Sequence, residues 1–110
     1  MLNDTISKIE AKLQNSSSIT EEQRSELLHL LSTLKREISA LSQTHEEQAQ
    51  SIAGFAELSA HEATREEKNP ELLKLSVQGL SSSVEGFEKS HPHLVGLVNR
   101  IATTLSNMGI

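Results

Sequence analysis

The sequence predicts an all-α protein built on a long antiparallel helical hairpin, and three observations lead to this prediction. Apolar residues recur at spacings of three and four along most of the chain, as expected for helices with one buried face. Only two prolines occur, and no stretch shows the apolar–polar alternation of a β-strand. Aromatic residues make up 2% of the composition against 35% for all apolar residues, which is typical of helical bundles built on aliphatic side chains. With 110 residues, we expect one helical domain over residues 1–110.

The first two helices are expected at about residues 3–14 and 21–66. The apolar residues of the first are spaced four, three and four: Leu2, Ile6, Ile9 and Leu13. The second begins with a capping box, in which the Thr20 hydroxyl accepts from the amide of Gln23 while the Gln23 side chain reaches back. Gly54 weakens a helix without ending it, so the pattern predicts one continuous helix.

Two further helices are expected at about residues 70–89 and 92–108. Asn69, followed by proline, is a favourable N-terminal cap with proline at the first helical position. Pro92 lacks an amide proton and crowds the preceding turn, so we expect a kink or a new helix start there. The apolar spacing nevertheless continues through Pro92, and Gly109 is expected to cap the end.

One antiparallel register, with its turn near residue 68, pairs the apolar residues of these long segments, as in a coiled coil. The same register places His45 opposite His91 and Gln48 opposite Phe87. These polar residues form a candidate polar core layer, and the first interpretation is that His45, Gln48 and His91 fix the register. The alternative is a pH- or metal-responsive regulatory bundle, because histidine changes charge near neutral pH.

Small side chains are concentrated on both arms near the predicted hairpin tip, where they would permit close approach of another helix. We name these a candidate self-association face: Ala53, Ala56, Ala60, Gly79 and Gly86. Two hairpins pairing through this face would form a four-helix bundle. We therefore expect a homo-oligomer, most simply a dimer, or a complex with another helical protein. The alternative is a thin, solvated tip.

The chemistry-bearing residues do not form a convergent set. Glu26 and His29, and Glu88 and His91, share the Glu-x-x-His spacing of di-metal bundles. The register keeps the two pairs apart, however, and Glu26 and His29 lie off the apolar stripe. We therefore expect no catalytic residue, no metal site and no cofactor, and a protein that is not an enzyme.

Composition also excludes several classes of partner. The net charge of −5 and the lack of a basic stripe argue against binding to nucleic acid. No apolar run approaches the roughly 20 residues that cross a bilayer, so we expect no membrane insertion. There is no cysteine, which excludes disulfides and thiolate chemistry. The first residues do not resemble a signal peptide, and we expect a cytoplasmic location.

The terminal block GFEKSHPHLVGLVNRIATTLSNMGI resembles a bacterial domain-of-unknown-function family, number 4404. The matching residues are Phe87, Glu88, Ser90, His91, Pro92, Leu94, Asn99, Arg100, Ile101, Ala102, Leu105, Met108, Gly109 and Ile110. The resemblance covers about a quarter of the chain and implies a bacterial, cytoplasmic, short helical protein. It brings no assigned activity. The expected function is therefore that of a non-enzymatic structural or protein-interaction module.

Overall fold

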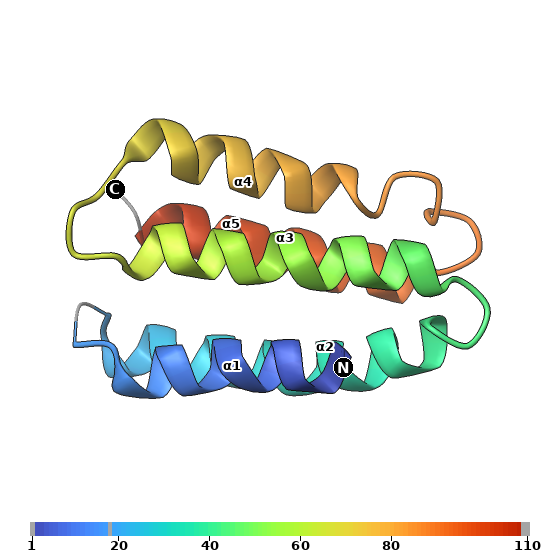
Figure 1. Ribbon diagram of the computed structural model, residues 1–110, viewed down its shortest axis with the longest axis horizontal. Helices are drawn as coiled ribbons and strands as arrows, with labels where there is room; N and C mark the ends of the chain where they lie inside the picture. The colour runs from blue at the N-terminus through green and yellow to red at the C-terminus, as the bar shows by residue number, and fades with distance from the viewer. Residues whose placement is uncertain (1, 18, 109–110) are drawn as a thin grey trace.

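The computed structural model describes residues 2–17 and 19–108, and these fold into helices joined by short turns (Figure 1). The helices, in chain order, are α1 (Leu2–Asn15), α2 (Glu21–Leu41), α3 (Glu46–Thr64), α4 (Pro70–Ser82) and α5 (Pro92–Met108). The described residues contain no strand, so the all-α prediction is confirmed. The whole bundle measures 37 × 24 × 21 Å.

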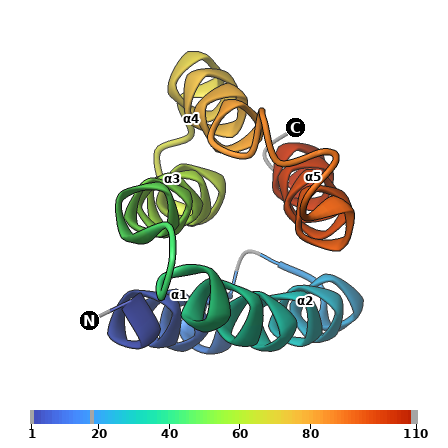
Figure 2. The same cartoon turned by 90° about the vertical axis from the view of Figure 1, so that its right-hand side faces the viewer.

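The helices stack in layers that are seen best along the bundle axis (Figure 2). α1 and α2 lie side by side at one face of the bundle, and α3 and α5 pack above them. α4 lies over α3 and α5 and contacts both of them. Every helix thus buries one face against at least two others, which a two-helix hairpin does not allow.

The predicted continuous helix over residues 21–66 was wrong, because the chain reverses between Leu41 and Glu46. Side-chain hydroxyls take part in this turn: Ser42 donates to the Ser39 carbonyl at 2.8 Å, and Thr44 donates to the Leu41 carbonyl. The amide of His45 donates to the same Leu41 carbonyl at 2.8 Å. Such local bonds offer the backbone an alternative to continued helix. The reversal lets α3 pack against α1, so the long hairpin does not form.

The predicted helix over residues 70–89 also ended early, at Ser82. The chain then runs through turns, and Gly86 adopts a φ of +97°, a conformation that only glycine reaches without strain. Phe87 stays buried in this turn region, so its apolar character reflects tertiary packing and not helical phase. The expected restart at Pro92 is confirmed, since α5 begins there and the Val95 amide donates to the His91 carbonyl at 3.2 Å.

The remaining helix starts agree with the sequence. The capping box is present: the Gln23 amide donates to the Thr20 hydroxyl, and the Thr20 amide donates to the Gln23 side chain, both at 3.1 Å. The Leu72 amide donates to the Asn69 side chain at 3.1 Å, which caps α4. Gly109, the expected final cap, lies outside the described residues.

Candidate functional site

The most unusual surface of the molecule lies along the outer side of α3 and α4. The large apolar side chains that the structure leaves exposed, with their exposed fractions, are Phe55 (37%), Leu58 (45%), Leu72 (42%) and Leu75 (54%). Two come from α3 and two from α4, and these helices pack against each other. We call these four residues the α3–α4 face. Single exposed leucines are common, but a contiguous group marks a binding surface in many proteins.

The face is contiguous because α3 and α4 approach each other closely. The Phe55 ring lies over Gly79: a methyl group added at Gly79 would stand 2.3 Å from the ring. One helical turn away, Leu58 and Leu75 lie at the same height of the antiparallel pair. Buried serines, Ser59 on α3 and Ser76 on α4, take the place of large core residues near this height. The small interior brings the two helices together and leaves the large side chains outside.

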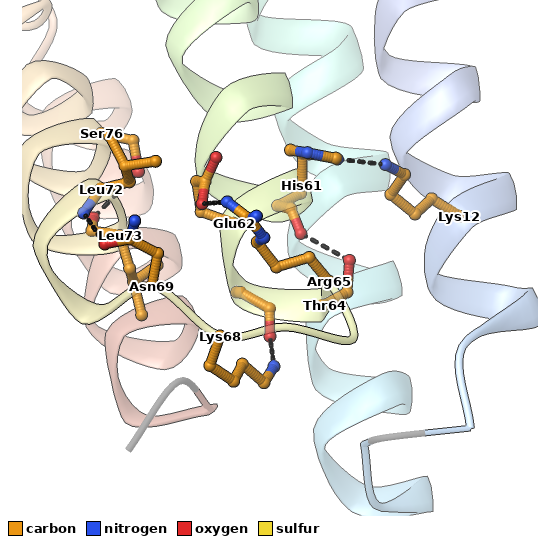
Figure 3. A network of polar contacts seen from close by, with 12 residues as sticks. Lys12, His61, Glu62, Thr64, Arg65, Lys68, Asn69, Leu72, Leu73 and Ser76 are labelled. Carbon is orange, nitrogen blue, oxygen red and sulfur yellow. Dashed lines mark hydrogen bonds and ion pairs between the residues drawn. The ribbon is translucent and has the colours of Figure 1, made fainter.

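A network of polar contacts fixes the turn between α3 and α4 (Figure 3). Arg65 donates to the Glu62 carboxylate at 2.9 Å, and Glu62 as a whole residue is 5% exposed. Thr64 donates to the Ala60 carbonyl at 2.7 Å, and the Lys68 ammonium donates to the Ala63 carbonyl. The Lys68 bond satisfies one of the last carbonyls of α3, which have no partner within the helix. The turn after α3 is thus fixed by bonds to the end of α3 itself.

The residues predicted as a self-association face do not form one surface. Ala53, Ala56 and Ala60 are buried inside the bundle, each 1% exposed, and serve internal packing. Gly79 is covered by the Phe55 ring, and Gly86 lies in the turn after α4. Because the chain reverses before α3, the alanine stripe faces the other helices of the same chain and is not available to a second copy.

The exposed apolar residues of the α3–α4 face were not identified from the sequence. A signal was present in α4, where Leu72, Leu73, Leu75 and Leu80 are too many for one narrow stripe. Leu73 and Leu80 are buried, which leaves Leu72 and Leu75 on the outer side. Which of these leucines face solvent depends on the position of α5, and this position is not visible in the sequence.

The structure brings together two members of the predicted polar layer and separates the third. The His45 and His91 ring centroids are 6.0 Å apart, and both rings stand edge-on to Phe87, at 5.5 and 5.3 Å. Thr44 hydrogen-bonds His45 Nδ1, and Ser90 hydrogen-bonds His91 Nδ1, both at 2.8 Å. Both imidazoles are half-buried at the end of the bundle, in the turns before α3 and α5.

Gln48 does not join this cluster, because it is exposed on the first turn of α3 and Ala49 takes the buried position. The one-residue shift follows from the helix break after Leu41, which resets the helical phase. Sequence spacing therefore placed the two histidines correctly in space although the continuous helix that suggested this pairing does not exist.

Polar residues between α2 and α5 pair with each other along a shallow groove of about 540 Å³. His93 Nδ1 lies 2.7 Å from Glu37, and Arg100 lies 3.8 Å from Glu26. Neither Glu-x-x-His pair gathers further ligands: among residues 2–17 and 19–108, no three His, Cys, Asp or Glu side chains are placed to hold a metal ion. Within the same ranges, no helix combines the length and apolarity needed to cross a bilayer.

Comparison with known proteins identifies the family of this chain. Searches of curated proteins and of solved structures gave no match. The model of a family described as a domain of unknown function, DUF4404, matches residues 31–110, which include the α3–α4 face and the terminal block. With most of its length matched in this way, the chain belongs to the DUF4404 family.

Proposed function

We propose that this protein is a non-enzymatic interaction module that binds a helical protein segment through the α3–α4 face. The observation that carries the proposal is the exposure of the four large apolar residues of that face on two adjoining helices. Burying such side chains against a partner removes apolar area from water at about 25 cal/mol per Å². The cytoplasmic location and bacterial origin stay predictions.

The position of the face on two adjoining helices favours a helical partner, because a third helix with its own apolar stripe can pack against such a pair. The face also has a polar border at one end, where Arg65 and Glu62 pair at 2.9 Å. An apolar centre with a polar border is the usual composition of a protein–protein interface.

The proposal is tested by photocrosslinking in the cells that produce the protein. A benzoylphenylalanine in place of Leu75 should give a protein adduct, whereas the same residue in place of the exposed Ser32 on α2 should not. Leu72→Glu in the same chain should abolish the adduct, because a charge is costly to bury within an apolar contact. Equal adducts from both positions, or an adduct that survives Leu72→Glu, would contradict the proposal.

A second candidate function rests on the ring cluster at the other end of the bundle. We propose as the alternative that His45 and His91 make the turns before α3 and α5 responsive to pH. Two imidazolium charges with ring centres 6.0 Å apart repel each other. The charged residues along these turns are Glu46, Glu47, Glu85, Glu88 and Lys89.

Hydrogen exchange separates this alternative from a plain scaffold. If the cluster responds to pH, amides around Gly86 should exchange faster at pH 5.5 than at pH 8 after correction for intrinsic rates. The change should vanish in a variant carrying both His45→Phe and His91→Phe. A pH effect of the same size in the variant would exclude the histidines as its cause.

A further inference from the structure

The net charge of this molecule is concentrated on the helices that carry the exposed apolar residues. Residues 46–82, which comprise α3, α4 and the turn between them, hold seven Asp or Glu and three Lys or Arg, a net charge of −4 with histidine counted as neutral. The charges of α1, α2 and α5 cancel, with six acidic and six basic residues. The whole chain carries −5, so most of its excess negative charge accompanies the α3–α4 face.

The basic residues of this region are few, and two of them already have partners in the chain. Arg65 forms an ion pair with Glu62 at 2.9 Å, so these two charges neutralise each other. The Lys68 ammonium donates to the Ala63 carbonyl at the end of α3. The remaining six carboxylates of residues 46–82 are exposed, against two exposed lysines, Lys68 and Lys74. The surface of these two helices is therefore both apolar and acidic.

Three of these carboxylates stand at the two ends of the α3–α4 face. Glu71 lies one helical turn before Leu75 on the same side of α4, and Glu67 lies in the turn that leads into this helix. Glu47 lies in the first turn of α3, about three turns before Leu58 and on the same side of that helix. Because α3 and α4 run antiparallel (Figure 1), a helix lying along the face has acidic groups beside both of its ends.

This charge selects among the candidate occupants of the face. A second copy of the chain would bring another acidic surface against the first, and like charges across an interface are unfavourable. An anionic membrane surface is repelled for the same reason. A helix with an apolar stripe bordered by Lys or Arg is complementary to the leucines and to the carboxylates together.

We propose that the occupant of the α3–α4 face is a basic amphipathic helix, which places Lys or Arg side chains beside Glu47, Glu67 and Glu71. The inference rests on the proposed function and names the chemistry of the partner. The apolar contact supplies most of the affinity, while the charges accelerate association and select against acidic helices. Binding weakens as the salt concentration rises, because salt screens exposed charges.

Two synthetic helices with the same leucine stripe serve as probes, one with lysine and the other with glutamate at every polar position. Each has about 18 residues, close to the 19 residues of α3. In calorimetric titrations of the full chain, the lysine helix should bind at least about 10-fold more tightly than the glutamate helix at about 50 mM salt. At about 500 mM salt the difference should fall below about threefold. Equal affinities at low salt overturn the inference.

A matched pair of variants distinguishes the charge of the face from the total charge. Glu71 and Glu22 are each the second residue of a helix, α4 and α2, where an acidic side chain also stabilises the helix itself. Glu71→Lys and Glu22→Lys therefore change the total charge and the helix terminus in the same way. Glu71→Lys should weaken binding of the lysine helix about fivefold at about 50 mM salt, and Glu22→Lys by less than about twofold. Equal losses would mean that the probe responds to total charge, and the inference would fail.

A further variant tests the apolar part of the contact. Leu75→Ala should weaken binding of the lysine helix about 10-fold at both salt concentrations, because the lost contact does not depend on charge. Ser32→Ala, a truncation on the exposed side of α2, should leave the affinity unchanged. A lysine helix that binds equally well to the Leu75→Ala chain binds at another surface, which overturns the inference.

The natural partner separates this inference from the proposed function. Mass spectrometry of the photoadduct formed at position 75 should identify a segment with more Lys and Arg than Asp and Glu. The adduct yield should fall with Glu71→Lys and not with Glu22→Lys. A position-specific adduct with an acidic or neutral segment, or with a second copy of this chain, overturns the basic helix while the interaction module stands. If positions 75 and 32 give equal adducts, the proposed function fails and the inference fails with it.

Discussion

The pair α2–α5 and the pair α3–α4 distribute their side chains in opposite ways. Between α2 and α5, large aliphatic residues such as Leu34 and Ile101 are buried, and the outer surface carries ion pairs such as Glu37–His93. On α3 and α4, alanines and serines occupy many of the buried positions, and large apolar residues such as Phe55 and Leu75 stay outside. The first pair buries its large apolar side chains within one chain, whereas the second presents an apolar surface that a partner can bury.

The largest expected effect concerns the two kinds of leucine. Leu34→Ala should lower the free energy of unfolding by about 3 kcal/mol, because it opens a cavity at a fully buried site. Leu75→Ala should change it by less than about 0.5 kcal/mol in the monomer, since Leu75 is 54% exposed. Urea denaturation at about 1 µM protein measures both. Equal losses would mean that Leu75 packs within the monomer.

The buried serines give the next comparison. The Ser59 hydroxyl is buried and has no hydrogen-bond partner among residues 2–17 and 19–108, whereas Ser76 donates to the Leu73 carbonyl at 2.9 Å. Ser59→Ala should therefore stabilise the fold by about 1 kcal/mol, since it removes an unsatisfied polar group and adds helix propensity. Ser76→Ala should bring no gain. Thermal unfolding of both variants decides this, and a loss in Ser59→Ala would show that the hydroxyl is bonded.

Two helical glycines, Gly54 on α3 and Gly79 on α4, provide a matched pair with different surroundings. A methyl group at Gly54 meets nothing within 4 Å, whereas one at Gly79 meets the Phe55 ring. Gly54→Ala should stabilise the fold by about 0.8 kcal/mol through helix propensity, and Gly79→Ala should fall well short of that gain. Adding Phe55→Ala should restore the gain of Gly79→Ala. If Gly79→Ala alone stabilises the fold as much as Gly54→Ala does, the Phe55 ring does not occupy the space next to Gly79.

The smallest expected effect lies at the histidine cluster. Replacing both His45 and His91 with leucine should raise the melting temperature near pH 6 by about 2–4 °C, as expected for about 0.5 kcal/mol in a domain of this size. Apolar side chains would pack against Phe87 without carrying charge. Differential scanning calorimetry measures the change, and an unaltered melting temperature would show that the two half-buried rings do not limit stability.

Sequence by itself determined the helical class, the capped starts of α2 and α4 and the restart at Pro92. These features depend on local chemistry: apolar spacing, a side chain that caps an amide, and a proline that has none. Family membership was also visible, because the terminal block carries its own pattern of residues. Local signals of this kind do not depend on where the other helices lie.

Only the tertiary structure decided the reversal between Leu41 and Glu46 and the surface that results from it. A continued helix and a turn both provide hydrogen bonds for the backbone at this point. The choice between them therefore depends on how much apolar surface each conformation buries. By reversing direction, the chain lets α3 pack against α1. That turn puts Ala53, Ala56 and Ala60 inside and leaves Phe55 outside. Helical periodicity marks two faces of a helix, but the neighbours available for packing determine which face is exposed.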